Sequence, residues 1–256
     1  MHILAHRGMV LEYPENTMPA LKAACQEGFG LELDVHRTKD GSLVVVHDAN
    51  LQRIAHTNTL VVDMNLASLK MLDIGSWFNS KFKEIRISTL DEACNMFLKI
   101  AEKDAIMAIN IKDDSEKEIE QLVVSCISKN KLEKRCFVFD MGLESIKRFK
   151  ALSKQIRVAA RVSEKESWGR LKDLNCVDII WFDEFFGNLY SEESIKDMHN
   201  CNKQVYAISP ELHINEGHPR SHTGYEETWE SLLRWGIDGI CTDFPLALKE
   251  RLQCTS

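Results

Sequence analysis

The chain has 256 residues, of which 44% are hydrophobic and 28% charged, and its formal net charge is −7. This length suits one large domain or two small ones, and the composition is typical of a globular protein with a sizeable core. The acidic balance argues against a nucleic-acid-binding or anionic-membrane surface, since both favour an excess of Lys and Arg. A phosphate-bearing substrate would therefore have to be held by a few placed cations.

Eight cysteines are scattered without a C-x-x-C pair. This pattern favours buried free thiols in a reducing cytosol over a disulfide framework or a zinc site. The N-terminus, M-H-I-L-A-H-R-G, lacks the regions of a signal peptide, and no window reaches the ~18 apolar residues that span a bilayer. We therefore expect a cytoplasmic protein without a transmembrane segment. The sequence gives no oligomeric state.

Short apolar runs alternate with amphipathic stretches along most of the chain. Eight runs contain β-branched residues and predict strands: Ile3–His6, Leu31–Arg37, Ala105–Lys112, Cys136–Asp140, Val158–Val162, Asp178–Asp183, Gln204–Ser209 and Gly239–Asp243. Helical periodicity predicts a helix that begins near Thr17 and further helices over Thr89–Lys103, Lys117–Lys129, Leu143–Leu152, Lys165–Leu174, Glu192–Asn200 and Glu226–Trp235. This alternation predicts a single (β/α)8 TIM barrel over residues 1–256. A doubly wound open sheet is the alternative, but no G-x-G-x-x-G follows an early strand.

The alternation breaks after the second predicted strand, at the turn sequence R-T-K-D-G-S. This turn is too short for a helical crossover, so Leu43–His47 must return antiparallel as a hairpin. With the turn centred near Asp40, partners across the hairpin have numbers that sum to about 79 or 80. His47 is then expected beside Glu32 and Leu33.

A second break is the polar stretch Asn50–Ser88, which is weakly periodic and carries the compact apolar segment M-L-D-I-G-S-W-F. Nearly forty residues without strong strand signals are long for a loop in a compact domain. We therefore expect residues 50–88 to form a small inserted subdomain or lid after the early β-hairpin.

Charged and imidazole side chains gather at the carboxyl ends of the predicted strands, where a (β/α)8 barrel carries its functional groups. The period of two along a strand puts Glu32 and Asp34 on one face. The whole set is two histidines, two carboxylates and two cations: His6, His47, Glu32, Asp34, Arg7 and Lys112. Carboxylates suit Mg²⁺ or Ca²⁺, the metal polarises a phosphoryl oxygen, and Arg and Lys neutralise developing charge. Because two histidines can serve as general base and acid, the set predicts metal-assisted attack on a phosphate ester.

Ordered motifs extend over nearly the whole chain: H-R-G (His6–Gly8), P-E-N-T (Pro14–Thr17), E-L-D-V (Glu32–Val35), T-K-D-G (Thr38–Gly41), V-V-H-D (Val45–Asp48), L-D-I-G-S-W-F (Leu72–Phe78), S-T-L-D-E-A (Ser88–Ala93) and G-I-D-G-I-C-T-D-F-P (Gly236–Pro245). In these motifs the chain resembles the glycerophosphodiester phosphodiesterase family. The resemblance implies a (β/α)8 barrel with an insertion where Asn50–Ser88 lies. It also implies a metal-dependent hydrolase that cleaves a small-molecule glycerophosphodiester into an alcohol and glycerol phosphate.

The resemblance implies roles for the residues that match the motifs. His6 and His47 are implied to be the acid–base pair, and Glu32 and Asp34 to bind the divalent metal, Mg²⁺ or Ca²⁺. In that mechanism one histidine helps to activate water or the neighbouring glycerol hydroxyl, and the other protonates the departing alkoxide. Phosphate contacts and support of the site are implied for two further pairs, respectively Arg7 with Lys112 and Glu15 with Asn16.

Three positions depart from the pattern that the resemblance implies. Asn110 stands where the family usually has Glu as a third metal ligand, and an Asn carbonyl brings no charge, so weaker metal binding is expected. The family's W-T-V-N strand end is replaced by A-I-S-P-E-L-H, which offers Glu211 and His213 to the substrate pocket. Asp140 stands where Ser is common, and Asp183 is a further pocket candidate at a strand end. These departures predict an altered choice of substrate.

Two other functions are compatible with the same residues. An internal hydroxyl can attack the phosphorus and give a cyclic phosphate, as in lysophospholipase-D-like relatives. The barrel can also be a non-catalytic protein that holds a phosphorylated ligand, and the uncharged Asn110 favours that alternative.

Overall fold

The structure, a computed structural model, describes residues 1–112, 118–164, 171, 174–187 and 189–255. In this part of the chain eight parallel strands form a closed ring, in the order β1 (His2–His6), β2 (Gly30–Arg37), β5 (Met107–Ile111), β6 (Cys136–Phe139), β7 (Arg157–Val162), β8 (Ile179–Phe182), β9 (Gln204–Ile208) and β10 (Gly239–Thr242). The ring closes because β1 pairs in parallel with both β10 and β2. The predicted (β/α)8 barrel is confirmed.

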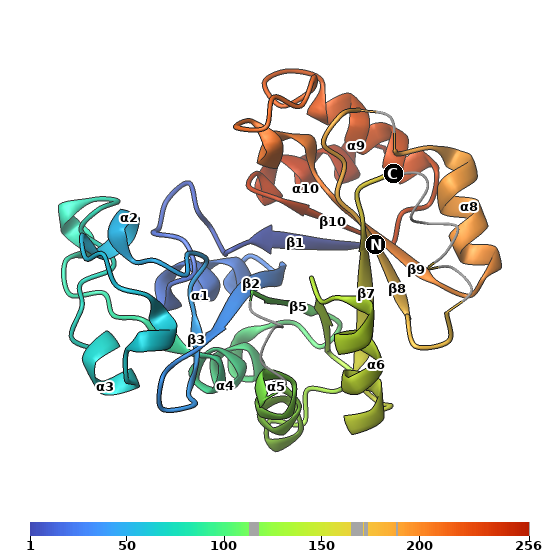
Figure 1. Cartoon of the computed structure of the whole chain (residues 1–256). Coiled ribbons are helices and arrows are strands. Elements are labelled where there is room, and N and C mark those ends of the chain that lie inside the picture. The colour runs from blue at the N-terminus through green and yellow to red at the C-terminus, as the bar shows by residue number, and fades with distance from the viewer. Residues whose placement is uncertain (113–117, 165–170, 172–173, 188, 256) are drawn as a thin grey trace.

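Helices surround the strands (Figure 1): α1 (Met18–Gln26), α4 (Leu90–Ile100), α5 (Glu118–Lys129), α6 (Leu143–Leu152), α8 (Glu192–Asn200), α9 (Tyr225–Arg234) and α10 (Pro245–Thr255). The sequence did not predict α10, because its apolar residues show only weak helical periodicity. The predicted helix Lys165–Leu174 lies mostly outside the described residues. In the described part of the chain, no helix combines the length and apolarity needed to cross a membrane.

Alternation along the strands separates a helix-facing core from the barrel interior. On β2, Leu33 packs into the large cluster between strands and helices, whereas Glu32 and Asp34 face the interior cavity. Below that cavity the interior is filled by buried aromatic side chains, Phe137, Trp181 and Tyr206. The polar residues at the mouth therefore rest on a closely packed apolar floor.

The hairpin has the register that the turn predicts. Strand β3 (Leu43–Val45) runs antiparallel to β2 with Val35 opposite Val45, so partner numbers sum to 80. The pairing ends at Val45, and His47 therefore lies just beyond the ladder. A short strand, β4 (Ser88–Thr89), pairs with the other edge of β3.

Residues 50–88 form short elements: α2 (Gln52–Ala55), the 3-10 turns η1 (Val61–Asp63) and η2 (Ser80–Phe82), and α3 (Leu66–Leu69). They pack around a separate apolar cluster that includes Val44 and Val46 of the hairpin and Leu51 and Ile54 of the insertion. Figure 1 shows α2 and α3 on the opposite side of the barrel from α8. Because the cluster includes hairpin side chains, the insertion shares its core with the barrel's edge.

Candidate active site

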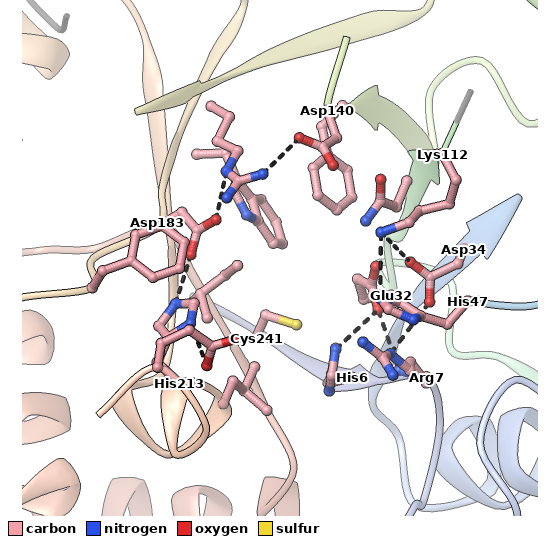
Figure 2. A pocket seen from close by; sticks show the side chains of 18 residues that line it. His6, Arg7, Glu32, Asp34, His47, Lys112, Asp140, Asp183, His213 and Cys241 are labelled. Carbon is pink, nitrogen blue, oxygen red and sulfur yellow. Dashed lines mark hydrogen bonds and ion pairs between the residues drawn. The ribbon is translucent and has the colours of Figure 1, made fainter. Parts of the chain in front are cut away.

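A cavity of about 210 Å³ opens at the carboxyl ends of the barrel strands. Nine residues predicted from the sequence line it: His6, Arg7, Glu32, Asp34, His47, Asn110, Lys112, Asp183 and His213. Figure 2 shows Asp183 and His213 across the cavity from Arg7, Asp34 and His47. The structure thus brings together the proposed acid–base, metal and phosphate groups.

A tight turn after β1 carries Arg7 into the cavity. Arg7 and Gly8 both have positive φ values, 55° and 92°. A Cβ on Gly8 would lie 2.6 Å from the carbonyl carbon of Ala20, so only glycine lets α1 approach the strand this closely. The amide of Arg7 donates to the carbonyl of Glu32 at 3.0 Å, which ties the turn to β2.

The two buried carboxylates of β2 have opposite electrostatic surroundings. Burial, reinforced by the charge of Asp34, raises the pKa of Glu32 to about 7. Burial also acts to raise the pKa of Asp34, but Arg7, 3.3 Å away, and Lys112, 3.8 Å away, contribute to the net lowering of that pKa. Asp34 is therefore the fixed anion of the site, whereas the charge of Glu32 depends on a neighbouring cation.

His6 and His47 each have a carboxylate at the Nδ1 atom. His6 Nδ1 lies 2.7 Å from Asp243, and His47 Nδ1 lies 2.7 Å from Asp48. This arrangement favours a proton on Nδ1 and leaves Nε2 for chemistry. His6 Nε2 is 4.0 Å from Glu32, and His47 Nε2 is 3.3 Å from the Lys112 ammonium.

The two imidazoles have opposite pKa shifts. Burial opposes the charge of His6, but Asp243 outweighs it, and the pKa of His6 is raised. Burial lowers the pKa of His47, and Arg7 adds to that effect, although Asp34 opposes it. Pairs of titratable groups whose pKa values are driven apart are typical of acid and base partners.

A chain of ion pairs outside the cavity supports Arg7 and His47. Glu15 accepts from Arg7 at 3.0 Å and from two nitrogens of Arg53 at 2.8 and 2.9 Å. Arg53 also donates to Asp48 at 2.7 Å. Asn16 lies under the site as well, since its amide nitrogen donates to Asp34 at 2.8 Å.

Sequence reasoning did not single out Asp243, Asp48 or Arg53. The H-D dipeptide at residues 47–48 was a signal for Asp48, and the strand end after Thr242 was a signal for Asp243. Nothing in the sequence marked Arg53, because it lies in the insertion.

Asn110 fits a metal ligand through an unpaired oxygen. It lies beside Asp34 in the β2–β5 register, and its buried Oδ1 has no hydrogen-bond partner among the described residues. Leaving a buried acceptor unpaired costs roughly 1–3 kcal/mol, which a bound cation would offset. Within the described ranges no three His, Cys, Asp or Glu side chains form a metal site. The donor set that fits a divalent cation is therefore Glu32, Asp34 and Asn110.

The opposite wall is an ion-pair cluster centred on Arg161 of β7. Its guanidinium lies 3.0 Å from Asp140 and 2.5 Å from Asp183. Asp183 also lies 2.6 Å from His213 Nε2. Arg161 was not predicted, although the alternation in A-A-R-V puts it on the inward face with Ala159.

Glu211, predicted for the pocket, lies elsewhere. It belongs to the 3-10 turn η3 (Pro210–His213) and is not among the described residues that line the cavity. Its buried carboxylate accepts from the hydroxyls of Ser209 and Thr242 and lies 3.3 Å from the amide of Asp243. The two hydroxyl donors lie on the side of the strand ends that faces α9, where Trp229 donates to Ser209, and Glu211 there supports the strand end that carries Asp243.

Comparison with known proteins gives consistent matches along the chain. The profile of the "Glycerophosphoryl diester phosphodiesterase family" matches residues 6–247. A glycerophosphodiester phosphodiesterase of Caldanaerobacter subterraneus is 30% identical over 251 residues, which cover 96% of this chain and 95% of the relative. One from Bacillus altitudinis is 28% identical and covers 95% and 94% of the two chains.

Solved structures show the same fold. A phosphodiesterase of Oleispira antarctica, in complex with the product sn-glycerol-3-phosphate, superposes with a TM-score of 0.81 at 23% identity, over 99% of this chain and 97% of that one. A glycerophosphodiester phosphodiesterase of Thermotoga maritima gives 0.71 at 23% identity, over 97% of both chains. At this identity these matches support the barrel, and the site must be argued from its own residues.

Proposed function

We propose that this chain, which belongs to the glycerophosphoryl diester phosphodiesterase family and is a phosphoric diester hydrolase, hydrolyses a glycerophosphodiester to glycerol phosphate and an alcohol. In this proposal His6 is the acid and His47 is the base. The observation that carries this proposal is the pair of histidines at one cavity, each with a carboxylate at Nδ1 and with pKa shifts of opposite sign.

The directions of the pKa shifts support one division of the two roles. The lowered pKa of His47 favours the unprotonated form, which accepts a proton from the attacking water through Nε2. The raised pKa of His6 favours the protonated form, which donates a proton from Nε2 to the departing alkoxide. A bond forms between the water oxygen and phosphorus, and the bond between phosphorus and the alcohol oxygen breaks. His47 gains the proton that water loses, and His6 loses the proton that the alcohol gains.

Arg7 and Lys112 are the cations that hold the phosphate. Both are already oriented by Asp34, at 3.3 and 3.8 Å, so little side-chain freedom remains to be lost on binding. Their charges stabilise the negative charge that develops on the phosphoryl oxygens. Glu15 and Asn16 keep Arg7 and Asp34 in place.

We further propose that Glu32, Asp34 and Asn110 hold Mg²⁺ or Ca²⁺. When bound, such an ion supplies Lewis-acid polarisation of a phosphoryl oxygen. The support is the unpaired Asn110 oxygen and the raised pKa of Glu32, since each is relieved by a nearby cation. Because Asn110 is uncharged, we expect Mg²⁺ affinity below that of a site with three carboxylates.

Phosphorus NMR of metal-loaded protein with a panel of glycerophosphodiesters tests the proposal. We expect glycerol phosphate as the first product, and a loss of about 10²–10⁴-fold in kcat/KM for His6→Asn and for His47→Asn. His199→Asn is the matched control, because His199 also pairs with a carboxylate, Asp238 at 2.8 Å, but on α8 away from the cavity. A cyclic phosphate as first product would establish the alternative reaction. Absence of any product across the panel would favour the non-catalytic barrel.

A further inference from the structure

The wall that faces the catalytic residues carries charges that the proposed reaction does not use. Arg161 is held between Asp140 and Asp183, and Asp183 also contacts His213. With one cation between two carboxylates, this triad keeps a formal charge of −1 (+1 − 2). Glu216, half exposed and 3.8 Å from His213, adds a further carboxylate at the rim.

The two sides of the cavity therefore differ in charge. On the catalytic side, the formal charges of Arg7 and Lys112 balance those of Glu32 and Asp34. On the opposite side the guanidinium of Arg161 forms ion pairs with two carboxylates, so it is poorly placed to bind a phosphate. Figure 2 shows Asp183 and His213 of this acidic wall across the cavity from Arg7 and Asp34, so a diester with its phosphate at the catalytic side can direct one of its two alcohol parts toward the wall.

One buried polar group on this wall lacks a hydrogen-bond partner among the described residues. The indole N–H of Trp181, a fully buried residue that lines the cavity, has no acceptor there. The Oδ1 atom of Asp183, a residue only 4% exposed, lies 2.6 Å from His213 Nε2 and is already part of that ion pair. Buried polar groups in native proteins are almost always paired, so the unpaired indole donor indicates a ligand in the cavity.

Aromatic rings accompany the carboxylates. The ring of Phe185 lies 4.4 Å from that of His213, and Arg161 already lies over Phe185 at 5.6 Å. Phe139 and Trp181 stack at 4.3 Å on the same lining. Carboxylates beside aromatic faces are a suitable environment for an organic ammonium group, through charge and cation–π attraction.

We propose that this wall, formed by Asp140, Arg161, Asp183 and His213, binds the alcohol part of the diester and selects alcohols that carry an ammonium group. The ammonium group is attracted to the net negative triad, and its N–H groups can donate to the carboxylates of Asp140 and Asp183. The inference rests on the proposed function for the position of the phosphate, and it adds the charge class of the head group.

The sharpest test compares two substrates of equal size, the glycerophosphodiesters of ethanolamine and of ethylene glycol, which differ by one charge. We expect wild type to prefer the ethanolamine diester by about tenfold in kcat/KM, the size of one partly screened charge interaction. Asp140→Asn should bring the ratio close to one. Asp140 has a φ of 66°, a backbone conformation that Asn adopts readily, so this variant keeps the local fold.

A second variant moves the preference in the opposite direction. Arg161→Gln removes the cation between two carboxylates, so the preference for the ethanolamine diester should rise above that of wild type. Glu144→Gln is the control, because Glu144 is an exposed carboxylate just after Asp140 that pairs with Lys147 on the outer surface. Its ratio should equal that of wild type.

The same ratio measured as binding affinities by calorimetry in His47→Asn protein separates this inference from the proposed reaction. A preference in binding without turnover in wild type would overturn the reaction and keep the head-group site. A ratio near one in wild type, or shifts of the same sign in Asp140→Asn and Arg161→Gln, would overturn the head-group site and keep the reaction.

Discussion

Arg53 links the insertion to Arg7 and to His47 through two carboxylates, and its replacement by Gln is the most informative perturbation outside the cavity. Its guanidinium makes four hydrogen bonds, two to Glu15 and two to Asp48, at 2.7 to 3.2 Å. Glu15 pairs with Arg7, and Asp48 orients His47. With the proposed roles of Arg7 and His47, Arg53 is a positioning residue that acts on the phosphate-binding cation and on the base through two carboxylates.

The expected size of the effect of Arg53→Gln follows from the exposure of the Arg53 side chain and the geometry of its hydrogen bonds. The Arg53 side chain is 42% exposed, so water screens its charges and the pairs are individually weak. Exposed ion pairs typically contribute about 0–1 kcal/mol each. The four bonds of Arg53 share one forked guanidinium, so we place their combined contribution at the upper end of this range and expect Arg53→Gln to lower the free energy of unfolding by about 1 kcal/mol. The looser His47 and Arg7 should reduce kcat/KM by about tenfold, which corresponds to roughly 1.4 kcal/mol in the activation barrier.

The pH profile separates positioning from simple stabilisation. Hydrogen bonds and charge from Arg53 contribute to lowering the pKa of Asp48 to about 2 against the effect of burial. Without Arg53 the Asp48 charge acts uncompensated on His47 and raises the pKa of the imidazole. Because the proposed base must be unprotonated, the acidic limb of kcat/KM should move to higher pH.

Arg86→Gln is the matched control, since Arg86 lies in the same insertion and pairs with Glu84 outside the cavity. It should leave both kcat/KM and the acidic limb unchanged. Arg53→Lys should recover only part of the loss, because Lys keeps the charge but not the fork. The reasoning would be refuted if Arg53→Gln matched Arg86→Gln in kcat/KM and in the position of the acidic limb.

Three further predictions address metal binding, pH-dependent stability and the core. Asn110→Asp should tighten Mg²⁺ binding about tenfold or more in calorimetry, and an unchanged affinity would remove residue 110 from the metal site. Because Asp243 raises the pKa of His6, the pair stabilises the fold fully below the ordinary histidine pKa, and this contribution is lost as the pH rises through the raised pKa. Asp243→Asn should therefore destabilise the protein more at pH 5.5 than at pH 9 in urea titrations, and equal losses would contradict the pairing. Phe137→Ala, in the fully buried floor, should lower the free energy of unfolding by about 3–5 kcal/mol, whereas Phe137→Leu should lower it by less than about 1.5 kcal/mol.

Two simple periodicities explain how much of the fold and site was predictable from the sequence. The repeated strand and helix patterns predicted the barrel, and the barrel predicts that strand ends converge. The period of two put Glu32 and Asp34 on the cavity face, and a six-residue turn signal set the register of the hairpin within one residue. Each of these inferences uses contacts between residues close in sequence or between neighbouring strands.

The residues that were missed depend on contacts between distant parts of the chain. His6 and Asp243 are 237 positions apart and meet only because the last strand closes on the first. Arg53 reaches the site from the insertion, whose path the polar pattern of residues 50–88 did not specify. Glu211 faces away from the cavity because the hydroxyl groups of Ser209 and Thr242 bind its carboxylate, and this depends on the local geometry of the η3 turn.

The uncharged Asn110 and the acidic wall both make the catalytic side of the cavity less negative than the opposite side. With Asn at position 110 the charges of the catalytic side cancel, whereas a carboxylate there would make that side as negative as the wall. If the phosphate binds at Arg7 and Lys112 as proposed, we expect Asp140 and Asp183 to repel it from the opposite wall. The orientation of the diester would then depend on a difference in charge between the two sides of one small cavity, and the uncharged Asn110 helps to create that difference.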